Sequence, residues 1–178
     1  MEINVWDRII AFEGRMHEFI KAAYDYQDNT FHSHPGYYID YFEMRLAQLQ
    51  VLHNLHYEIK KIRKMPKQAL VIADYIMYMA DYVVEMNIPD QQIEKLEEIS
   101  EQMKQEELPK TREEFEGRAL LYHILMDLEE FLVYKKRFVS GLDEKKLRIY
   151  WKQEMEQKDS ANAVSYTHLR AHETAANL

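Results

Sequence analysis

Apolar residues recur at three- and four-residue steps along most of the chain, and this spacing predicts amphipathic α-helices. The predicted helices cover residues 4–27, 37–64, 67–86, 90–105, 111–138 and 143–157. Helices that each carry one apolar face bury these faces best against one another. The pattern therefore predicts an all-α fold: an antiparallel up-and-down bundle of four to five main helices with a short C-terminal helix.

Turn and cap residues set the predicted helix ends. Pro66 begins a new element and Pro89 ends the third helix, because proline lacks the backbone donor. Thr111 and Glu114 have the spacing of a capping box, and Ser140-Gly141 stops the helix that they open. The predicted buried face of the first helix is Val5, Ile9, Phe12, Met16, Phe19 and Ala23, and that of the third is Ala69, Ile72, Ala73, Ile76, Ala80 and Val83. The face predicted for the helix after Thr111 is Leu121, Ile124, Leu125, Leu128, Phe131 and Leu132.

Composition excludes several classes of protein. The chain has no cysteine, so disulfides, thiolate zinc sites and a cysteine nucleophile are excluded. Its longest apolar run, residues 69–73, is far shorter than the roughly 20 residues of a membrane span. A net charge of −8 disfavours nucleic-acid binding, and no glycine-rich phosphate loop occurs. No nucleophile–base pair is found, so we expect neither an enzyme nor a cofactor.

The last residues differ in character from the rest. Residues 164–174 resemble the in-frame translation of a sequencing adapter. We therefore expect one helical domain over residues 1–160, followed by a disordered, non-native tail over residues 161–178. His168 and His172 are for this reason left out of any argument about metal binding.

The other histidines give two weak metal candidates, since imidazole and carboxylate ligands suit zinc or nickel. His32 and His34 form a His-x-His pair near His17, Asp25 and Asp28. His53 and His56 lie three residues apart on the second predicted helix. We interpret the first pair as solvated and the second as lying at the edge of the core, and predict no metal site.

Tyrosines, acids and bases each gather in part of the chain. Most of the 13 tyrosines lie in the first three helices, where they fit the border of a core better than a ligand pocket. Acids outnumber bases between Asp90 and Glu116, as on a solvated helix face. Lys60, Lys61, Arg63, Lys64 and Lys67 surround the end of the second helix. Such a cluster suits the negative end of a helix dipole.

Two segments resemble a known family. The run Tyr37-Tyr38-Ile39-Asp40-Tyr41-Phe42-Glu43-Met44-Arg45, continuing to Gln48, is similar to a helix signature in the C-terminal domain of aromatic acid exporters. The run Leu108-Pro109-Lys110-Thr111-Arg112-Glu113-Glu114-Phe115-Glu116-Gly117-Arg118-Ala119 is similar to that domain's second signature. The resemblance covers about residues 3–140.

The resemblance implies a helical domain on the cytoplasmic side of the bacterial inner membrane, joined to a membrane half that precedes it in the parent protein. We expect a non-catalytic role in assembly, regulation or ligand sensing, with that membrane half as a partner and with homo-oligomers possible. If the first helix descends from the membrane, the basic cluster at Lys60–Lys67 returns to an anionic lipid surface. This interpretation requires Trp6 and Lys64 to lie at the same end of the bundle.

Four residues of the two signatures are candidates for ligand or partner contacts: Tyr38, Tyr41, Arg45 and Arg118. Each arginine could clamp a carboxylate, although a helix–helix ion pair with Glu43, Glu114 or another acid of the bundle is the stronger expectation. Two alternatives to the exporter domain stay open. One is a stand-alone helical module that binds a protein partner, and the other is a metal-dependent enzyme that uses His32 and His34.

Overall fold

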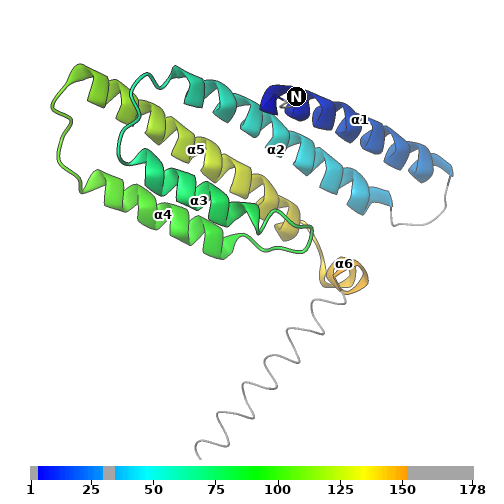
Figure 1. Ribbon diagram of the computed structural model, residues 1–178. Coiled ribbons are helices and arrows are strands. Elements are labelled where there is room, and N and C mark those ends of the chain that lie inside the picture. The colour runs from blue at the N-terminus through cyan, green and yellow to red at the C-terminus, as the bar shows by residue number, and fades with distance from the viewer. Residues whose placement is uncertain (1–3, 30–34, 152–178) are drawn as a thin grey trace, which may run out of the picture. The chain divides into compact units, whose positions relative to one another are not determined.

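The computed structural model describes residues 4–29 and 35–151, and all regular secondary structure in these ranges is helical (Figure 1). The helices are α1 (Val5–Asn29), α2 (Pro35–Lys61), α3 (Ala69–Ala80), α4 (Asp90–Lys104), α5 (Arg112–Ser140) and α6 (Glu144–Tyr150). The predicted all-α class is confirmed, and five of the helices form a bundle.

The chain divides into two compact units, Met1–Ser140 and Gly141–Leu178. In the second unit, the carboxylate of Asp143 caps α6 by accepting a hydrogen bond from the backbone N–H of Lys146 at 2.7 Å. The predicted continuation of this helix to residue 157, the predicted domain end at residue 160 and the adapter-like segment 164–174 all lie outside the described residues.

Consecutive helices of the first unit run antiparallel (Figure 1). The Trp6 ring near the start of α1 lies 4.2 Å from the ring of His53 in the second half of α2, whereas Phe19 stacks on Phe42 in the first half. Gln48 of α2 donates a 2.7 Å hydrogen bond to the carbonyl of Phe131 in α5. At one end of α4, Asp90 pairs with Lys136 of α5 at 2.9 Å.

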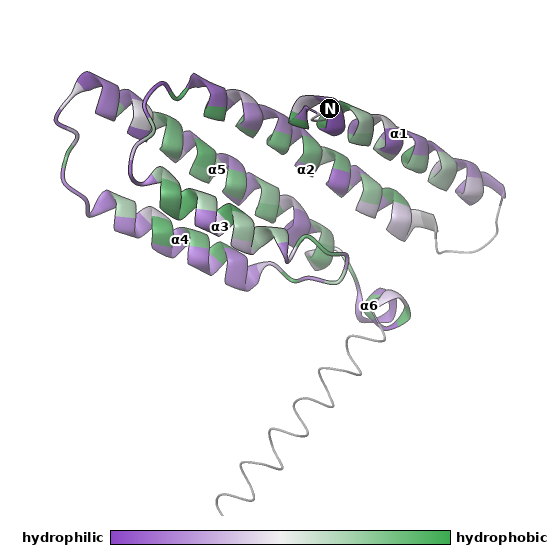
Figure 2. Ribbon diagram, in the orientation of Figure 1, coloured by the Kyte–Doolittle hydropathy of each residue, from purple (hydrophilic) through white to green (hydrophobic). Residues whose placement is uncertain are grey.

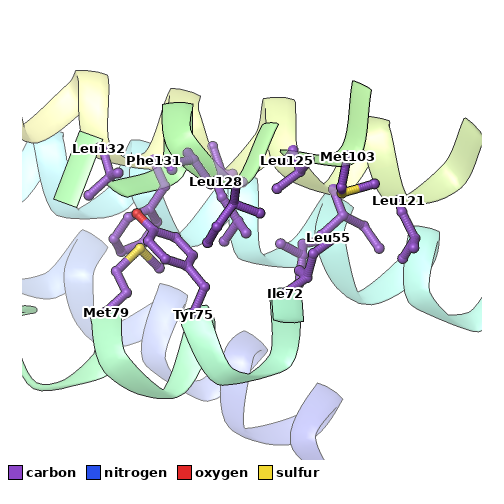
Figure 3. Packing of buried hydrophobic residues seen from close by; sticks show 14 residues of the cluster. Leu55, Ile72, Tyr75, Met79, Met103, Leu121, Leu125, Leu128, Phe131 and Leu132 are labelled. Carbon is purple, nitrogen blue, oxygen red and sulfur yellow. The ribbon is translucent and has the colours of Figure 1, made fainter. Parts of the chain in front are cut away.

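The main core lies where α2, α3, α4 and α5 meet (Figure 3). The apolar face predicted for α5 is confirmed, because all six of its predicted residues are buried: Leu121, Ile124, Leu125, Leu128, Phe131 and Leu132. Tyr75 of α3 is also part of this core, and its hydroxyl donates a 2.7 Å hydrogen bond to the carbonyl of Gln92. Burial raises the pKa of this hydroxyl. The sequence suggested that the tyrosines lie at the border of the core. Tyr75 instead lies inside the core, and its hydroxyl bonds to the protein backbone.

The buried face predicted for α1 is largely wrong. Met16 is the one buried residue of α1, whereas Val5, Phe12 and Phe19 are exposed. The reason is that α1 packs along α2 and contributes no residue to the main core. A helix that contacts one neighbour covers only a narrow line of side chains, and the rest of its apolar residues stay at the surface.

Helix α3 ends at Ala80, six residues before the predicted end at residue 86. Its last turn tightens, since the backbone N–H groups of Tyr82 and Val83 bond to carbonyls three residues back. The next residues make long-range contacts instead. Glu85 accepts one hydrogen bond at its carboxylate from the Tyr37 hydroxyl (2.8 Å) and another at its carbonyl from the Lys135 ammonium. Ala73, Ala80 and Val83, which were predicted to face the core, are exposed.

A close contact fixes the α2–α3 connection against α5. Pro66 of this connection lies over Gly117, and a Cβ atom added to that glycine would lie 2.9 Å from Pro66 Cγ. A proline ring gives way less easily than a flexible side chain. Gly117 is therefore the residue that allows the chain after α2 to approach α5 so closely. Among the residues that the structure describes, none has an atom within 4 Å of a Cβ atom built on Gly14 of α1.

These two glycines give a matched pair of substitutions. Gly14→Ala is expected to stabilise the protein by about 0.5–1 kcal/mol through helix propensity alone. Gly117→Ala gains the same propensity but adds an overpacking cost of about 1–3 kcal/mol against Pro66. Urea unfolding of both variants should therefore place Gly117→Ala below Gly14→Ala by about that cost. Equal stabilisation by both changes would contradict the close contact.

Candidate functional site

The residues predicted for function lie in two separate places. Tyr38, Tyr41 and Arg45 lie in the first half of α2, whereas Arg118 lies near the start of α5. Lys64 is close to the start of α5, because its carbonyl lies 3.5 Å from a Cβ atom built on Gly117. Arg118 and the basic cluster therefore share one end of the bundle, and the α2 signature does not.

We call residues 60–67, with their five cations Lys60, Lys61, Arg63, Lys64 and Lys67, the basic turn. It contains the last two residues of α2 and most of the connection to α3. Lys61 pairs with Glu58 at 2.6 Å. The other four cations are exposed and form no ion pair with any residue that the structure describes.

The basic turn lies at the end of the bundle where α1 begins. The Trp6 ring contacts the rings of His53, His56 and Tyr57, at 4.2, 5.5 and 5.2 Å between centroids. Tyr57 is one helical turn before Lys61, a distance of about 6 Å along the axis. The structure thus places Trp6 and Lys64 at the same end, which is the arrangement that the lipid-surface interpretation requires.

A groove of about 790 Å³ is lined by the basic turn and by the first half of α5. Its charged lining comprises Lys61, Arg63, Lys64, Arg112, Glu113 and Glu116, and its other lining residues are Phe115, Gly117, Ala119, Leu120 and His123. Arg112 pairs with Glu116 at 2.9 Å. The last turn of α2 and the first turn of α5, which flank this groove, are both hydrophilic (Figure 2).

Arg118 stabilises the entry to α5. It forms an ion pair with Glu114 at 2.7 Å and donates a 2.6 Å hydrogen bond to the carbonyl of Glu107. Glu114 also accepts a hydrogen bond from the backbone N–H of Lys110, and this bond and then Arg118 hold the pKa of Glu114 below its usual value. Thr111 accepts from the N–H of Glu114 at 3.1 Å, as the capping pattern predicted. The expected ion pair of Arg118 with Glu114 is thus present, but it lies within α5 and does not join two helices as expected.

Arg45 is held by neutral groups. Its Nε donates to the Tyr41 hydroxyl at 3.1 Å and one terminal nitrogen donates to Gln48 at 2.8 Å. Its guanidinium carbon lies 5.1 Å from the Tyr41 ring centre, a cation–π contact. Among the described residues, no carboxylate lies within ion-pair distance of Arg45. The expected pairing of Arg45 with a bundle acid is therefore absent from the described part of the chain.

The cavity beside Arg45 is small. It encloses about 10 Å³ between Arg45, Gln48 and Lys135, enough for about one water molecule. Tyr41 stacks with Tyr37 at 6.4 Å and meets Phe138 edge-on at 5.7 Å, whereas Tyr38 contacts Tyr37 edge-on at 5.3 Å. Tyr37 and Tyr41 pack between α2 and Phe138 near the end of α5, whereas Tyr38 is 44% exposed. The cavity of about 10 Å³ beside Arg45 is too small for an aromatic acid.

Comparison with known proteins fits this arrangement. Residues 4–136 match the family described as "Putative aromatic acid exporter C-terminal domain". The chain belongs to this family. It is 32% identical over 98 residues to "Uncharacterized protein YqjA" of Bacillus subtilis (strain 168), a stretch covering 55% of this chain and 30% of that protein. It also resembles the crystal structure of a putative membrane protein from Clostridium difficile 630, with a TM-score of 0.67, 26% identity and coverage of 78% and 83% of the two chains.

The matched stretch of this chain spans about a third of the length of the curated relative. None of the helices within residues 4–29 and 35–151 is long and apolar enough to cross a membrane. In the same ranges, no group of three or more histidines and carboxylates is placed to hold a metal ion. His32 and His34 lie outside the described residues. His53 and His56 lie against Trp6 at the edge of the bundle.

The sequence did not reveal the role of three residues that form the groove at the basic turn and the surroundings of Arg45. Gly117 allows the basic turn to pack on α5, and Phe115 is 61% exposed although it lies in the first turn of a core helix. Gln48 is 3% exposed and links Arg45 to the backbone of α5. A glutamine within an apolar helix face was the available signal for the last of these, because buried amides need partners.

Substitution of Gln48 tests this buried link. Gln48→Met keeps the size of the side chain but removes its hydrogen bond to the carbonyl of Phe131 and leaves the Arg45 guanidinium without its Gln48 acceptor, so the free energy of unfolding should fall by about 1–3 kcal/mol. Gln50→Met, at an exposed position on the same helix, is the control and should change stability by less than about 0.5 kcal/mol. Chemical unfolding that gives both variants the same stability would contradict the role of Gln48.

Asp127 is a partly buried titratable group that the sequence did not indicate. Burial, followed by the nearby carboxylates of Glu58 and Glu130, raises the pKa of Asp127. One of its carboxylate oxygens is buried and has no hydrogen-bond partner among the described residues. A raised pKa means that the folded state holds the proton more tightly than the unfolded state. The stability that this supplies is full below the unfolded pKa and is lost as the pH rises through the folded value.

Asp127→Asn is therefore expected to be more stable than the parent protein at pH 7, by up to about 1 kcal/mol because the site is partly screened by water. The difference should shrink as the pH falls through the raised folded pKa of Asp127, and it should have vanished below about 4, the unfolded value. Unfolding followed by circular dichroism at several pH values measures this. Asp74→Asn, at an exposed position on α3, is the control. A stability gain independent of pH would rule out the electrostatic cause.

Proposed function

We propose that this chain is a non-catalytic accessory domain of an exporter-like bacterial membrane protein, placed on the cytoplasmic side of the inner membrane. In this proposal the membrane half of the parent protein precedes α1. The domain then serves in assembly and regulation of that half. Membership of the exporter family and the likeness to a solved putative membrane protein support this placement.

The position of the basic turn is the observation that carries the proposal. A chain that enters α1 from the membrane returns through α2 to the same end, so the basic turn meets the bilayer surface. Each Lys or Arg close to an anionic bilayer contributes about 1 kcal/mol of attraction. Four of the five cations in the basic turn are exposed and have no ion pair with a described residue, so they are free to contact lipid headgroups.

The surface of α1 supports a role in assembly. Val5, Phe12 and Phe19 are all exposed, and their seven-residue spacing places them along one face of α1. Neighbouring apolar side chains at a surface are typical of protein contacts. In the assembled protein these residues would meet the membrane half or a second copy of the domain.

Vesicle binding tests the placement. The full chain should sediment with vesicles that contain phosphatidylglycerol and not with pure phosphatidylcholine, and binding should weaken as salt is raised. Arg63→Gln combined with Lys64→Gln removes about 2 kcal/mol of attraction, which is about a 30-fold loss of affinity. The control pair, Lys21→Gln with Arg137→Gln, removes equal charge from the other end of the bundle. Vesicle binding that does not change with salt, with lipid charge or with substitution of Arg63 and Lys64 would overturn the proposal.

A second candidate is a stand-alone helical module that binds a protein partner, and the exposed apolar residues of α1 favour it. This candidate predicts no preference for anionic vesicles. It also predicts that Phe12→Ser with Phe19→Ser abolishes a complex with a partner protein. The same vesicle experiment therefore separates the two functions.

A further inference from the structure

We propose that the groove between the basic turn and α5 binds the phosphodiester headgroup of a single anionic phospholipid, an inference that rests on the proposed membrane-surface function. It goes beyond a diffuse attraction between cations and a bilayer, because it assigns one ligand to one groove. Size is the first argument. A space of about 790 Å³ can hold a phosphate and its glycerol substituents.

The charges in the groove match one phosphodiester. Lys61 is neutralised by Glu58 and Arg112 by Glu116, at 2.6 and 2.9 Å. Of the remaining charged residues that line the groove, two are cations, Arg63 and Lys64, and one is the carboxylate of Glu113. The groove is thus left with one net positive charge, which the single negative charge of a diester phosphate balances. A polyanion such as nucleic acid would also face the acids of the α4–α5 connection, Glu106 and Glu107.

The cations are attached to a backbone that is already held in place. Pro66 packs on Gly117, and the carbonyl of Lys64 lies close to the same glycine. The backbone N–H of Ala69 bonds to the carbonyl of Pro66 at 3.0 Å and closes the turn. Binding therefore has to order only the side chains of Arg63 and Lys64, which lowers the entropy cost of holding an anion.

The apolar part of the groove identifies the anion as a lipid. Phe115 lines this groove and also a smaller hollow of about 220 Å³ beside Leu108. Phe115 is 61% exposed and Leu108 is 85% exposed. Ala119 and Leu120 continue the apolar lining along α5. Cations beside exposed aromatic and aliphatic side chains are the combination that contacts both headgroup and acyl chain at a membrane surface.

Binding of soluble short-chain lipid tests the groove apart from vesicle adsorption. Dihexanoylphosphatidylglycerol, titrated below its micelle concentration into the full chain, should bind saturably with one site by calorimetry. Dihexanoylphosphatidylcholine and inorganic phosphate should each bind at least tenfold more weakly. Amide shifts in a labelled sample should concentrate at residues 61–67 and 112–120.

Variants separate the contributions to binding. Arg63→Gln with Lys64→Gln should weaken the short-chain lipid at least tenfold, and Phe115→Ala about threefold to tenfold. Met126→Ala, an equally exposed apolar position of α5 outside the groove, is the matched control and should leave affinity unchanged. Near-ultraviolet circular dichroism checks that each variant is folded.

Each contrary outcome has a distinct meaning. Vesicle binding without a saturable short-chain lipid site would overturn the groove and leave the proposed function intact. Equal affinity for inorganic phosphate would assign the groove to free phosphate, and displacement by a glutamate-rich peptide would assign it to an acidic protein segment. Either result would overturn the lipid assignment. Loss of both vesicle and short-chain binding would remove the proposed function as well.

Discussion

The burial of one face of α5 is the constraint on which the rest of the bundle depends. Helices α2, α3 and α4 all pack on this helix, and six apolar residues between Leu121 and Leu132 form the surface that they share. Any shift of α5 would expose this seam to water, at a cost of about 25 cal/mol for each Å². Helix α1 stands outside this arrangement, because it packs on the opposite flank of α2 (Figure 1).

Sequence periodicity predicts the helices of this fold well where packing surrounds them. The apolar face of α5 is correct because three neighbours cover it, so that its whole stripe is buried. The prediction of a buried face on α1 is wrong because periodicity shows which residues share a face, but not how many neighbouring helices cover that face. The predicted end of α3 at residue 86 is wrong for a different reason. Contacts of Tyr37 and Lys135 with Glu85 hold this segment outside the helix, and they join residues about 50 positions apart.

The candidate site shows the same division between local and long-range information. The basic turn follows from the sequence, because consecutive cations at a helix end are visible there. The groove cannot be predicted from the sequence, because it depends on the contact of Pro66 with Gly117, two residues that are far apart in the chain. Phe115 was assigned to a signature of the exporter family, but only the structure places its ring at the rim of a basic groove. A glycine within a helix did not by itself reveal this approach, because Gly14 of α1 also precedes an arginine and has no described neighbour within 4 Å of a Cβ atom built on it.

The two signature arginines and the cations of the basic turn differ in what the fold requires of them. Arg118 holds the carbonyl of Glu107 and the carboxylate of Glu114, and Arg45 holds Tyr41 and Gln48. A ligand would have to replace these internal contacts, so binding at either arginine would be opposed by the stability of the bundle. Arg63 and Lys64 have no such contact with a described residue, while the backbone that carries them is fixed. An anion could therefore bind them without breaking any described contact of the fold, which is why we propose this end of the bundle as the anion-binding surface.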